Sequence, residues 1–268
     1  MTKSLTLVKL GGSVITEKAK VLTANIVAIR RLANEIAESR VRKLMIVHGG
    51  GSFGHPLAQQ YAIQEGFTDP SQLIGINKTH HAMLQLNKIV VEALIHHNIP
   101  AFPVVPASCM ISKDGRINIF ATDTLRILLE MDLVPVLFGD VVLDTEKGFT
   151  IISGDQIIAA VATRFSAARI IMAVDVDGLF TDDPKTNTSA ELLRRLTPQE
   201  LRTFIINRTG KIEDAKILDV TGGMLGKVAE LLLAVEAGIP TLIINAKKDN
   251  NLRMVLTTNE TSGTLIAK

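Results

Sequence analysis

The chain has 268 residues, with 29 lysines and arginines against 27 aspartates and glutamates and a single cysteine, Cys109. One cysteine cannot form an internal disulfide, which is typical of a reducing compartment, and we expect a small buried residue there. Basic runs and stacking aromatic residues are too few for a nucleic-acid-binding surface. The apolar runs are far shorter than the roughly 20 residues that span a bilayer, and no signal-peptide pattern is present. We therefore expect a soluble cytoplasmic protein that binds neither nucleic acid nor membranes.

Short apolar runs alternate with amphipathic stretches in the first half of the chain. This pattern predicts a helical start near Pro56 and two hairpins, one turning at 113–115 and one over 141–152. The remaining predictions are strands over 5–10, 43–48, 101–105 and 133–138 and helices over 24–39, 77–97 and 122–131.

The second half continues the alternation, with helices predicted over 155–166, 197–205 and 224–237 and strands over 169–174 and 241–246. Continuous Val/Ile/Leu strands between helices indicate an α/β protein, a three-layer αβα sandwich with a mainly parallel central sheet. Neither a linker nor a repeat is present. Residues 1–268 therefore form one domain, with a soft boundary near 150 between two lobes on one continuous sheet.

Glycines follow the predicted strands or open the helices at four places. They are Gly11-Gly12, Gly49-Gly50-Gly51, Gly154 and Gly222-Gly223. In an open parallel sheet, ligands lie outside the carboxyl ends of the strands. Glycine there lets backbone N–H groups approach an anion, and a helix N-terminus adds a favourable field. Four such places favour one extended phosphate site over ordinary turns.

Two lysines stand beside these glycines. Lys9 lies inside an apolar strand, where burying an ammonium group is costly unless it meets an anion, although an edge-strand lysine in solvent is an alternative. Lys227 is expected in the first turn of its helix, where the helix dipole disfavours a cation unless a phosphate is bound. Lys18 is either a ligand of the same site or a solvated loop residue.

The segment from Gly49 to Gly54 matches G-x-G-x-x-G, the spacing of dinucleotide-binding turns. That fingerprint needs an acidic residue about 20 positions on, at the end of the next strand. Asp69 is at the right distance but lies in a loop, and the next predicted strand ends at Pro106. No Walker A loop occurs either. A dinucleotide site is therefore disfavoured.

Five segments, LVKLGGSVIT, VHGGGSFGHP, ISGDQI, DVDGLFTDDP and DVTGGMLGKV, resemble the amino acid kinase superfamily in this order over essentially the whole chain. GSFGH with its histidine is most similar to the isopentenyl phosphate kinase family. The resemblance implies transfer of the γ-phosphoryl group of ATP to isopentenyl phosphate in isoprenoid biosynthesis. It also implies Mg²⁺ on ATP without protein metal ligands, and a homodimer. The acceptor would bind in an N-terminal lobe (about 1–150), and the nucleotide in a C-terminal lobe (about 151–268).

The resemblance further implies a role for each matching residue. Lys9 and Lys227 would bracket the transferring phosphoryl group, Asp155 would hold both lysines, and His55 would bind the acceptor phosphate. A phosphate acceptor is already ionised, so cations that offset the repulsion between two anions matter more than a general base. The ATP-binding set is Lys9, Gly11, Gly12, Lys18, Gly51, Asp175, Asp177, Gly178, Gly222 and Lys227. The acceptor set is Gly50, Gly51, Gly54, His55 and Gly154, with Gly11, Gly12, Gly50 and Gly51 as backbone donors.

Several alternatives stay open from the sequence. His55 could instead cap or pack beside Pro56, and other histidines, His80, His81, His96 and His97, are expected on a helix surface. Ile74, Ile76, Met83 and Leu86 are candidates for a tail pocket, although a core role is favoured. Residues 181–189 are expected to form a solvated loop. Alternative functions are a sister kinase acting on a fosfomycin-type phosphonate, glutamate or carbamate, and a non-catalytic nucleotide sensor.

Overall fold

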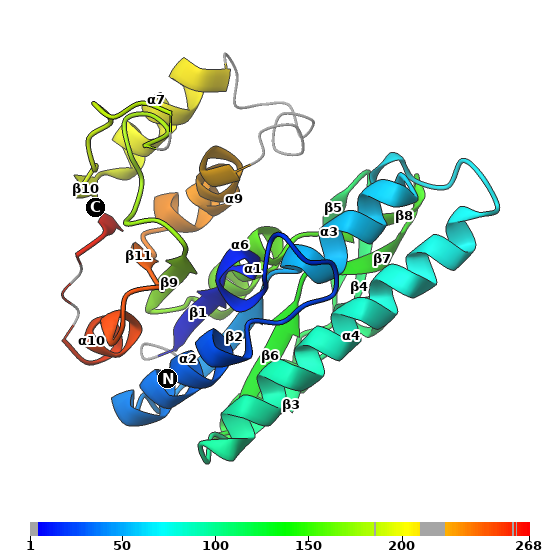
Figure 1. Ribbon diagram of the computed structural model, residues 1–268, viewed down its shortest axis with the longest axis horizontal. Coiled ribbons are helices and arrows are strands. Elements are labelled where there is room, and N and C mark those ends of the chain that lie inside the picture. The colour runs from blue at the N-terminus through cyan, green and yellow to red at the C-terminus, as the bar shows by residue number, and fades with distance from the viewer. Residues whose placement is uncertain (1–4, 185, 210–222, 259, 261) are drawn as a thin grey trace.

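The computed structural model describes residues 5–184, 186–209, 223–258, 260 and 262–268 (Figure 1). Its centre is an eight-stranded sheet in which all neighbours are parallel except β11 and β12. In sheet order the strands are β10 (Arg195–Leu196), β12 (Thr264–Ile266), β11 (Thr241–Asn245), β9 (Arg169–Val174), β1 (Thr6–Leu10), β2 (Leu44–His48), β6 (Val134–Phe138) and β3 (Ala101–Pro103).

Helices cover both faces of this sheet. They are α1 (Gly12–Ile15), α2 (Ile26–Ser39), α3 (Gly51–Gln60), α4 (Gln72–His96), α5 (Asp123–Glu130), α6 (Gly154–Phe165), α7 (Pro198–Thr209), α9 (Gly223–Glu236) and α10 (Asn251–Thr258), with single 3₁₀ turns at η1 (Ile63–Glu65) and η2 (Pro106–Ser108). The apolar sides of α2, α4 and α10 form one core layer, and those of α5, α6 and α9 form the other. The expected three-layer αβα sandwich is thereby confirmed. None of the helices within the described ranges has the length and apolar character needed to cross a bilayer.

Strand β1 positions the site. It lies between β2 and β9, so the winding of the sheet reverses beside it, and ligands bind outside the carboxyl ends of strands at such a point. Side chains alternate along a strand. Leu7 joins the core layer under α6, whereas Val8 and Leu10 join the opposite layer under α2 and α4. Lys9 therefore faces the same layer as Leu7, where α6 packs against β1.

The two predicted hairpins are confirmed, and together they form a second, four-stranded sheet. Its order is β5 (Arg116–Phe120), β4 (Met110–Lys113), β7 (Asp140–Asp144) and β8 (Gly148–Ile152). The buried Asp144 joins the two hairpin turns, because its carboxylate accepts the N–H of Gly115 at 2.8 Å and that of Lys147 at 2.9 Å. Burial alone would raise the pKa of Asp144, but these backbone donors lower it to about 2.

Some element boundaries differ from the sequence expectation. α3 begins at Gly51, and Pro56 lies inside it. Proline cannot donate to the carbonyl four residues earlier, and that carbonyl, on Ser52, accepts the N–H of Leu22 instead, at 3.0 Å. α4 begins at Gln72, whose side-chain oxygen accepts the N–H of Thr68 at 2.7 Å. Short elements were not predicted: α1, η1, η2, β10, α10 and β12.

Candidate active site

A cleft of about 1220 Å³ opens at the carboxyl ends of the central strands. This volume exceeds the roughly 300–1,000 Å³ that is usual for one small ligand, so the cleft has room for two. Its walls include the turns that follow β1, β2 and β9 and the first residues of α6 and α9. The site predictions on Gly50, Gly51, Gly54, Gly154, Gly11, Gly12, Gly178, Lys9, Lys18, His55, Asp155, Asp175 and Lys227 all fall on residues that line it.

Two lysines share one carboxylate at the base of the cleft. Lys9 on β1 is 2% exposed, and its Nζ donates to Asp155 Oδ1. Lys227 on α9 donates to Asp155 Oδ2 at 3.2 Å. Asp155 is the second residue of α6, where an acidic side chain is favoured by the helix dipole, and Ser153 caps the helix by accepting the N–H of Gln156 at 3.1 Å.

This trio carries one excess positive charge. Burial lowers the pKa of Lys9 to about 8, although Asp155 partly opposes the shift. Burial would raise the pKa of Asp155, but Lys9 and then Lys227 hold it below its ordinary value. The single carboxylate of Asp155 neutralises only one of the two ammonium groups. An anion that enters the cleft therefore meets a net positive charge.

The turns after β1 and β2 pack backbone against backbone. A Cβ on Gly12 would lie 2.4 Å from the amide nitrogen of Gly51, and one on Gly51 would lie 2.1 Å from Thr16 Oγ1. Gly51 also has a left-handed φ of 49°. Glycine at these positions is therefore required by the contact between the turns, independently of any ligand.

The same turns offer free donors, with one exception. Within the described part of the chain, no hydrogen bond is donated by the N–H groups of Gly12, Gly50 or Gly51. The N–H of Gly11 is donated to the carbonyl of Ala173 at 2.8 Å. Gly11 was expected to donate to phosphate, and that expectation is wrong because this turn is held against β9 by the same N–H group.

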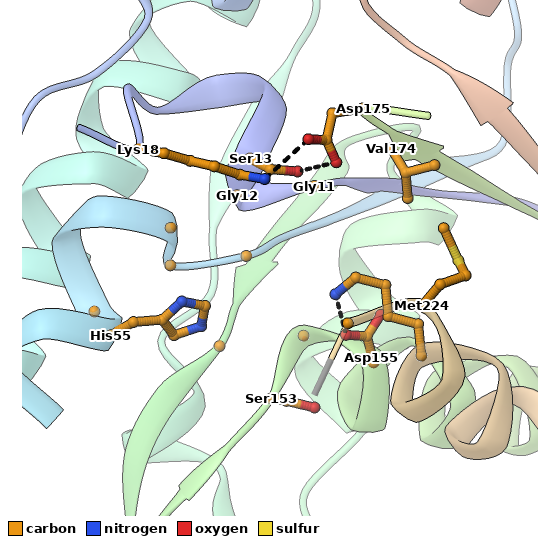
Figure 2. A pocket seen from close by; sticks show the side chains of 18 of the residues that line it. Gly11, Gly12, Ser13, Lys18, His55, Ser153, Asp155, Val174, Asp175 and Met224 are labelled. Carbon is orange, nitrogen blue, oxygen red and sulfur yellow. Dashed lines mark hydrogen bonds and ion pairs between the residues drawn. The ribbon is translucent and has the colours of Figure 1, made fainter. Parts of the chain in front are cut away.

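A second charged group lies above the turn after β1. Figure 2 shows Ser13 and Lys18 reaching Asp175, with Ser13 Oγ donating at 2.7 Å and Lys18 Nζ at 3.0 Å. Burial would raise the pKa of Asp175, but the hydrogen bonds from Ser13 and Lys18 lower it to about 2. Lys18 is thus paired rather than simply solvated, although its side chain is 62% exposed.

The remaining residues predicted on the nucleotide side differ in whether they line the cleft. Asp177 is not among the described residues that line the cleft, and its carboxylate accepts Asn245 Nδ2 at 2.9 Å and pairs with Lys248 at 2.6 Å. Gly178 does line it, and a Cβ there would lie 2.5 Å from Thr264 Oγ1. Gly222 lies outside the described residues. The loop expected over 181–189 contributes two further lining carboxylates, Asp182 and Asp183.

His55 projects from α3 into the cleft. In Figure 2 it faces the same space as Asp155, from the opposite side. Among the described residues, no hydrogen bond holds its imidazole ring, which favours a ligand-binding role over helix capping. Desolvation at the cleft wall, then Lys227 and Lys9, lower the pKa of His55, although the residue is exposed to the open cleft. The shift favours the neutral ring in the ligand-free protein.

The wall beside His55 mixes apolar side chains with polar ones such as Gln59, Gln64 and Glu65. Met83 of α4 lies under the turn after β2, because Cβ atoms on Gly50 and Gly54 would be 3.0 and 3.1 Å from its sulfur. Of the four tail-pocket candidates, Met83 alone lines the cleft among the described residues. Leu86 is fully buried in the core, Ile76 packs against a small cluster under η1, and Ile74 is 59% exposed. Sequence reasoning missed lining residues from distant elements: Ala58, Ala62, Thr79 and Ile151.

Two histidines of the chain are tied to buried partners. His80 was expected on the helix surface, and its side chain is 30% exposed, but its Nδ1 also lies 2.8 Å from Oδ1 of the fully buried Asp140, a partner that was not expected. The hydrogen bond that the ring donates to Asp140 raises the pKa of His80. His48, which sequence reasoning did not single out, ends β2 directly before the glycine turn. Its ring lies 3.1 Å from Asn87 Oδ1, and burial lowers its pKa to about 4.

Cys109 was expected to be buried; it is half-buried and packs against the core, and its Sγ lies 3.5 Å from the carbonyl oxygen of Val105. Burial raises the pKa of the thiol to about 11. At neutral pH the group is therefore a thiol and not a thiolate, which makes it a poor nucleophile.

Comparisons with known proteins agree with this geometry. A sequence profile described as the amino acid kinase family matches residues 4–245. Isopentenyl phosphate kinase of Methanothermobacter thermautotrophicus is 38% identical over 97% of this chain and 98% of its own length. The Methanocaldococcus jannaschii protein of the same name is 32% identical over 98% of each chain. A crystal structure of an isopentenyl phosphate kinase aligns with a TM-score of 0.85 and 36% identity, covering 98% of this chain and 100% of that one.

Proposed function

Because this chain belongs to the amino acid kinase family, we propose that it transfers the γ-phosphoryl group of ATP to isopentenyl phosphate, releasing isopentenyl diphosphate and ADP. The relatives named above, similar along their whole length, support this acceptor. One observation carries the proposal. Lys9 and Lys227 converge on Asp155 at the base of a cleft, and His55 faces the same space from the other side.

The proposed reaction is a direct displacement. An oxygen of the acceptor phosphate forms a bond to the γ-phosphorus, while the bond from that phosphorus to the bridging oxygen of ADP breaks. No strong base is needed, since the acceptor oxygen is already ionised. His55 would bind the acceptor phosphate, and Lys9 and Lys227 would neutralise the charge that gathers between the two anions. Asp155 would keep both lysines aimed at that point.

Backbone N–H donors and the ion pair of Lys18 with Asp175 complete the assignment of residues to the two substrates. We assign the free N–H groups of Gly12, Gly50 and Gly51 to phosphate oxygens, because the two adjoining turns present them at the carboxyl ends of β1 and β2. Lys18 and Asp175 would act on the nucleotide side. Gly54 and Gly154 would shape the acceptor side and Gly178 the nucleotide side. The nucleotide role of Gly222, which lies outside the described residues, stays a prediction.

Mg²⁺ is expected with ATP, and the donor groups on hand fit a metal held mostly by the nucleotide. The described residues include no group of three or more His, Cys, Asp or Glu side chains able to hold a metal. Both oxygens of Asp155 are engaged by lysines, and those of Asp175 by Ser13 and Lys18. Mg²⁺ usually keeps several waters and binds substrate phosphates, and it would supply additional charge neutralisation on them.

Purified protein with Mg·ATP is expected to release ADP when isopentenyl phosphate is added. Glutamate and carbamate should give far less, because a site built around His55 and two lysines matches a phosphate dianion. Fosfomycin should also give far less, because the relatives that match along the whole chain are isopentenyl phosphate kinases. A coupled ADP assay over the four acceptors makes the comparison. Equal turnover on any of the other three would reject the acceptor assignment, and binding of ATP without turnover on any acceptor would favour a nucleotide sensor.

Replacing His55 by alanine is expected to reduce kcat/KM for isopentenyl phosphate at least tenfold, about 1.4 kcal/mol in barrier. The neutral ring in the ligand-free protein should gain a proton beside a phosphate dianion, and the variant loses that contact. His81→Ala is the control, since His81 is exposed on α4. If the two variants have equal kinetics, His55 has only a packing role.

The homodimer, the cytoplasmic location and the division into an acceptor lobe (about 1–150) and a nucleotide lobe (about 151–268) remain predictions. The central sheet takes strands from both halves of the chain, with β1, β2, β3 and β6 from the first and β9 to β12 from the second. A continuous sheet of this kind fits two binding regions on one framework better than two separate domains.

A further inference from the structure

The two lysines that pair with Asp155 are held in different ways. Lys9 lies on the central strand β1, and its side chain is 3% exposed. Lys227 lies on α9, with its side chain 31% exposed, and it reaches Asp155 Oδ2 at 3.2 Å. The position of Lys227 therefore depends on how α9 is held against α6.

A two-pronged ion pair fixes α9 from the side of the second sheet. Arg116, the first residue of β5, donates from Nη1 to Glu230 Oε1 at 2.6 Å and from Nη2 to Glu230 Oε2 at 2.8 Å. The side chain of Glu230 is 8% exposed and that of Arg116 is 37% exposed, so solvent reaches this pair from the arginine side only. Bidentate arginine–carboxylate pairs set orientation as well as distance. Glu230 follows Lys227 by three residues, which places both on one face of α9.

The same hairpin turn also holds α6. Gln156 Oε1 accepts the N–H of Ile117 at 3.0 Å, and Gln156 Nε2 donates to the carbonyl of Gly115 at 3.3 Å. Gln156 directly follows Asp155. Residues 115–117 thus bind both helices that bring Lys227 and Asp155 together, although Arg116 is not among the described residues that line the cleft.

We propose that Arg116 is a positioning residue for phosphoryl transfer, which holds Lys227 against Asp155 by fixing α9 through Glu230. The proposal rests on the proposed function, in which Lys227 acts on the transferring group. Loss of the pair lets α9 move away from α6, so Lys227 contributes less in the transition state. The acceptor contacts of His55 and the glycine turns are left in place. The effect therefore falls on kcat and not on KM for the acceptor.

The kinetic test compares Arg116→Ala and Glu230→Gln with a matched control on the same helix. The control is Arg202→Ala, because Arg202 Nε donates to Glu236 Oε1 at 2.7 Å and so ties α9 to α7, away from the cleft. We expect kcat to fall at least tenfold in the first two variants and less than twofold in the control, with KM for isopentenyl phosphate within threefold of wild type in all. Arg116→Lys keeps the charge but cannot form the two-pronged pair with Glu230, so its kcat should lie between those of wild type and Arg116→Ala.

A second readout needs no substrate. Burial and then Lys227 lower the pKa of His55, and Lys9 and Asp155, which also face it, are unchanged in these variants. NMR titration of the ligand-free protein, with the His55 signal assigned from His55→Ala, should show a higher pKa in Arg116→Ala and Glu230→Gln but not in Arg202→Ala. Folding is checked by circular dichroism, and Glu230→Gln carries the test if Arg116→Ala does not fold.

The outcomes separate the two proposals. A folded variant whose kcat and His55 pKa both match those of Arg202→Ala would overturn the role of Arg116. Wild-type protein without activity on isopentenyl phosphate would instead reject the proposed function, and the titration would still decide whether Arg116 places Lys227 near His55.

Discussion

Replacing Lys9 by methionine is expected to lower kcat at least a thousandfold, about 4 kcal/mol in barrier. Methionine nearly matches the length of the lysine and suits the buried surroundings of β1, so the fold should persist. The variant removes the deepest cation of the cleft and leaves Asp155 with Lys227 as its only lysine partner among the described residues. Turnover of isopentenyl phosphate and thermal unfolding, measured on the same preparation, separate a catalytic loss from a folding defect.

Lys43→Met serves as the control for that experiment. Lys43 also donates to a carboxylate, that of Asp132 at 2.6 Å, but this pair lies on the surface and outside the cleft. The kcat of the Lys43→Met variant should stay within twofold of the wild-type value. A folded Lys9→Met protein that loses less than tenfold in kcat would show that the excess charge at the base of the cleft does not drive the reaction.

The Asp155→Asn variant is expected to lose at least a hundredfold in kcat/KM at pH 8, about 2.7 kcal/mol, and to recover part of the loss at lower pH. Burial lowers the pKa of Lys9 to about 8 and Asp155 opposes that shift. Without the carboxylate the pKa of Lys9 falls further, so its ammonium form is lost as the pH rises through the lowered value. The alkaline limb of the kcat/KM profile, which reports the free enzyme, should therefore move toward acid.

Asp249→Asn is the matched control, since the side chain of Asp249 is 78% exposed beside Arg31 and outside the cleft. Its pH profile should overlay that of the wild type. An unmoved alkaline limb in Asp155→Asn would mean that Asp155 does not control the ionisation of Lys9.

Local chemistry made part of the site predictable from sequence. A lysine inside an apolar strand, such as Lys9, is stable only beside an anion or at a solvent-exposed edge of the sheet. A serine before a glycine and an acid, as at Ser153, marks a helix start. These signals depend on neighbours in the chain, and the predicted resemblance to the amino acid kinase superfamily is confirmed by the family match. The central strands were predictable for the same reason, because strands buried on both faces are apolar throughout.

Other features depend on residues far apart in the chain. His80 meets Asp140 across 60 positions, and the pairing of β4 with β7 joins two hairpins that each look complete alone. The N–H of Gly11 donates to the carbonyl of Ala173, on a strand more than 160 residues away in the sequence. A periodic pattern indicates which side of an element is buried, but it does not specify the partner, so these contacts could not be predicted.

The interlocked turns after β1 and β2 constrain how such a protein can diversify. A side chain at Gly12 or Gly51 would push apart the two turns, and so disturb at once the donors that we propose for both substrates. Residues on α3 and α4, such as His55 and Met83, line the cleft at its proposed acceptor end and are not part of the contact between Gly12 and Gly51. Acceptor preference can therefore change through those two helices while the phosphate-binding floor is inherited intact.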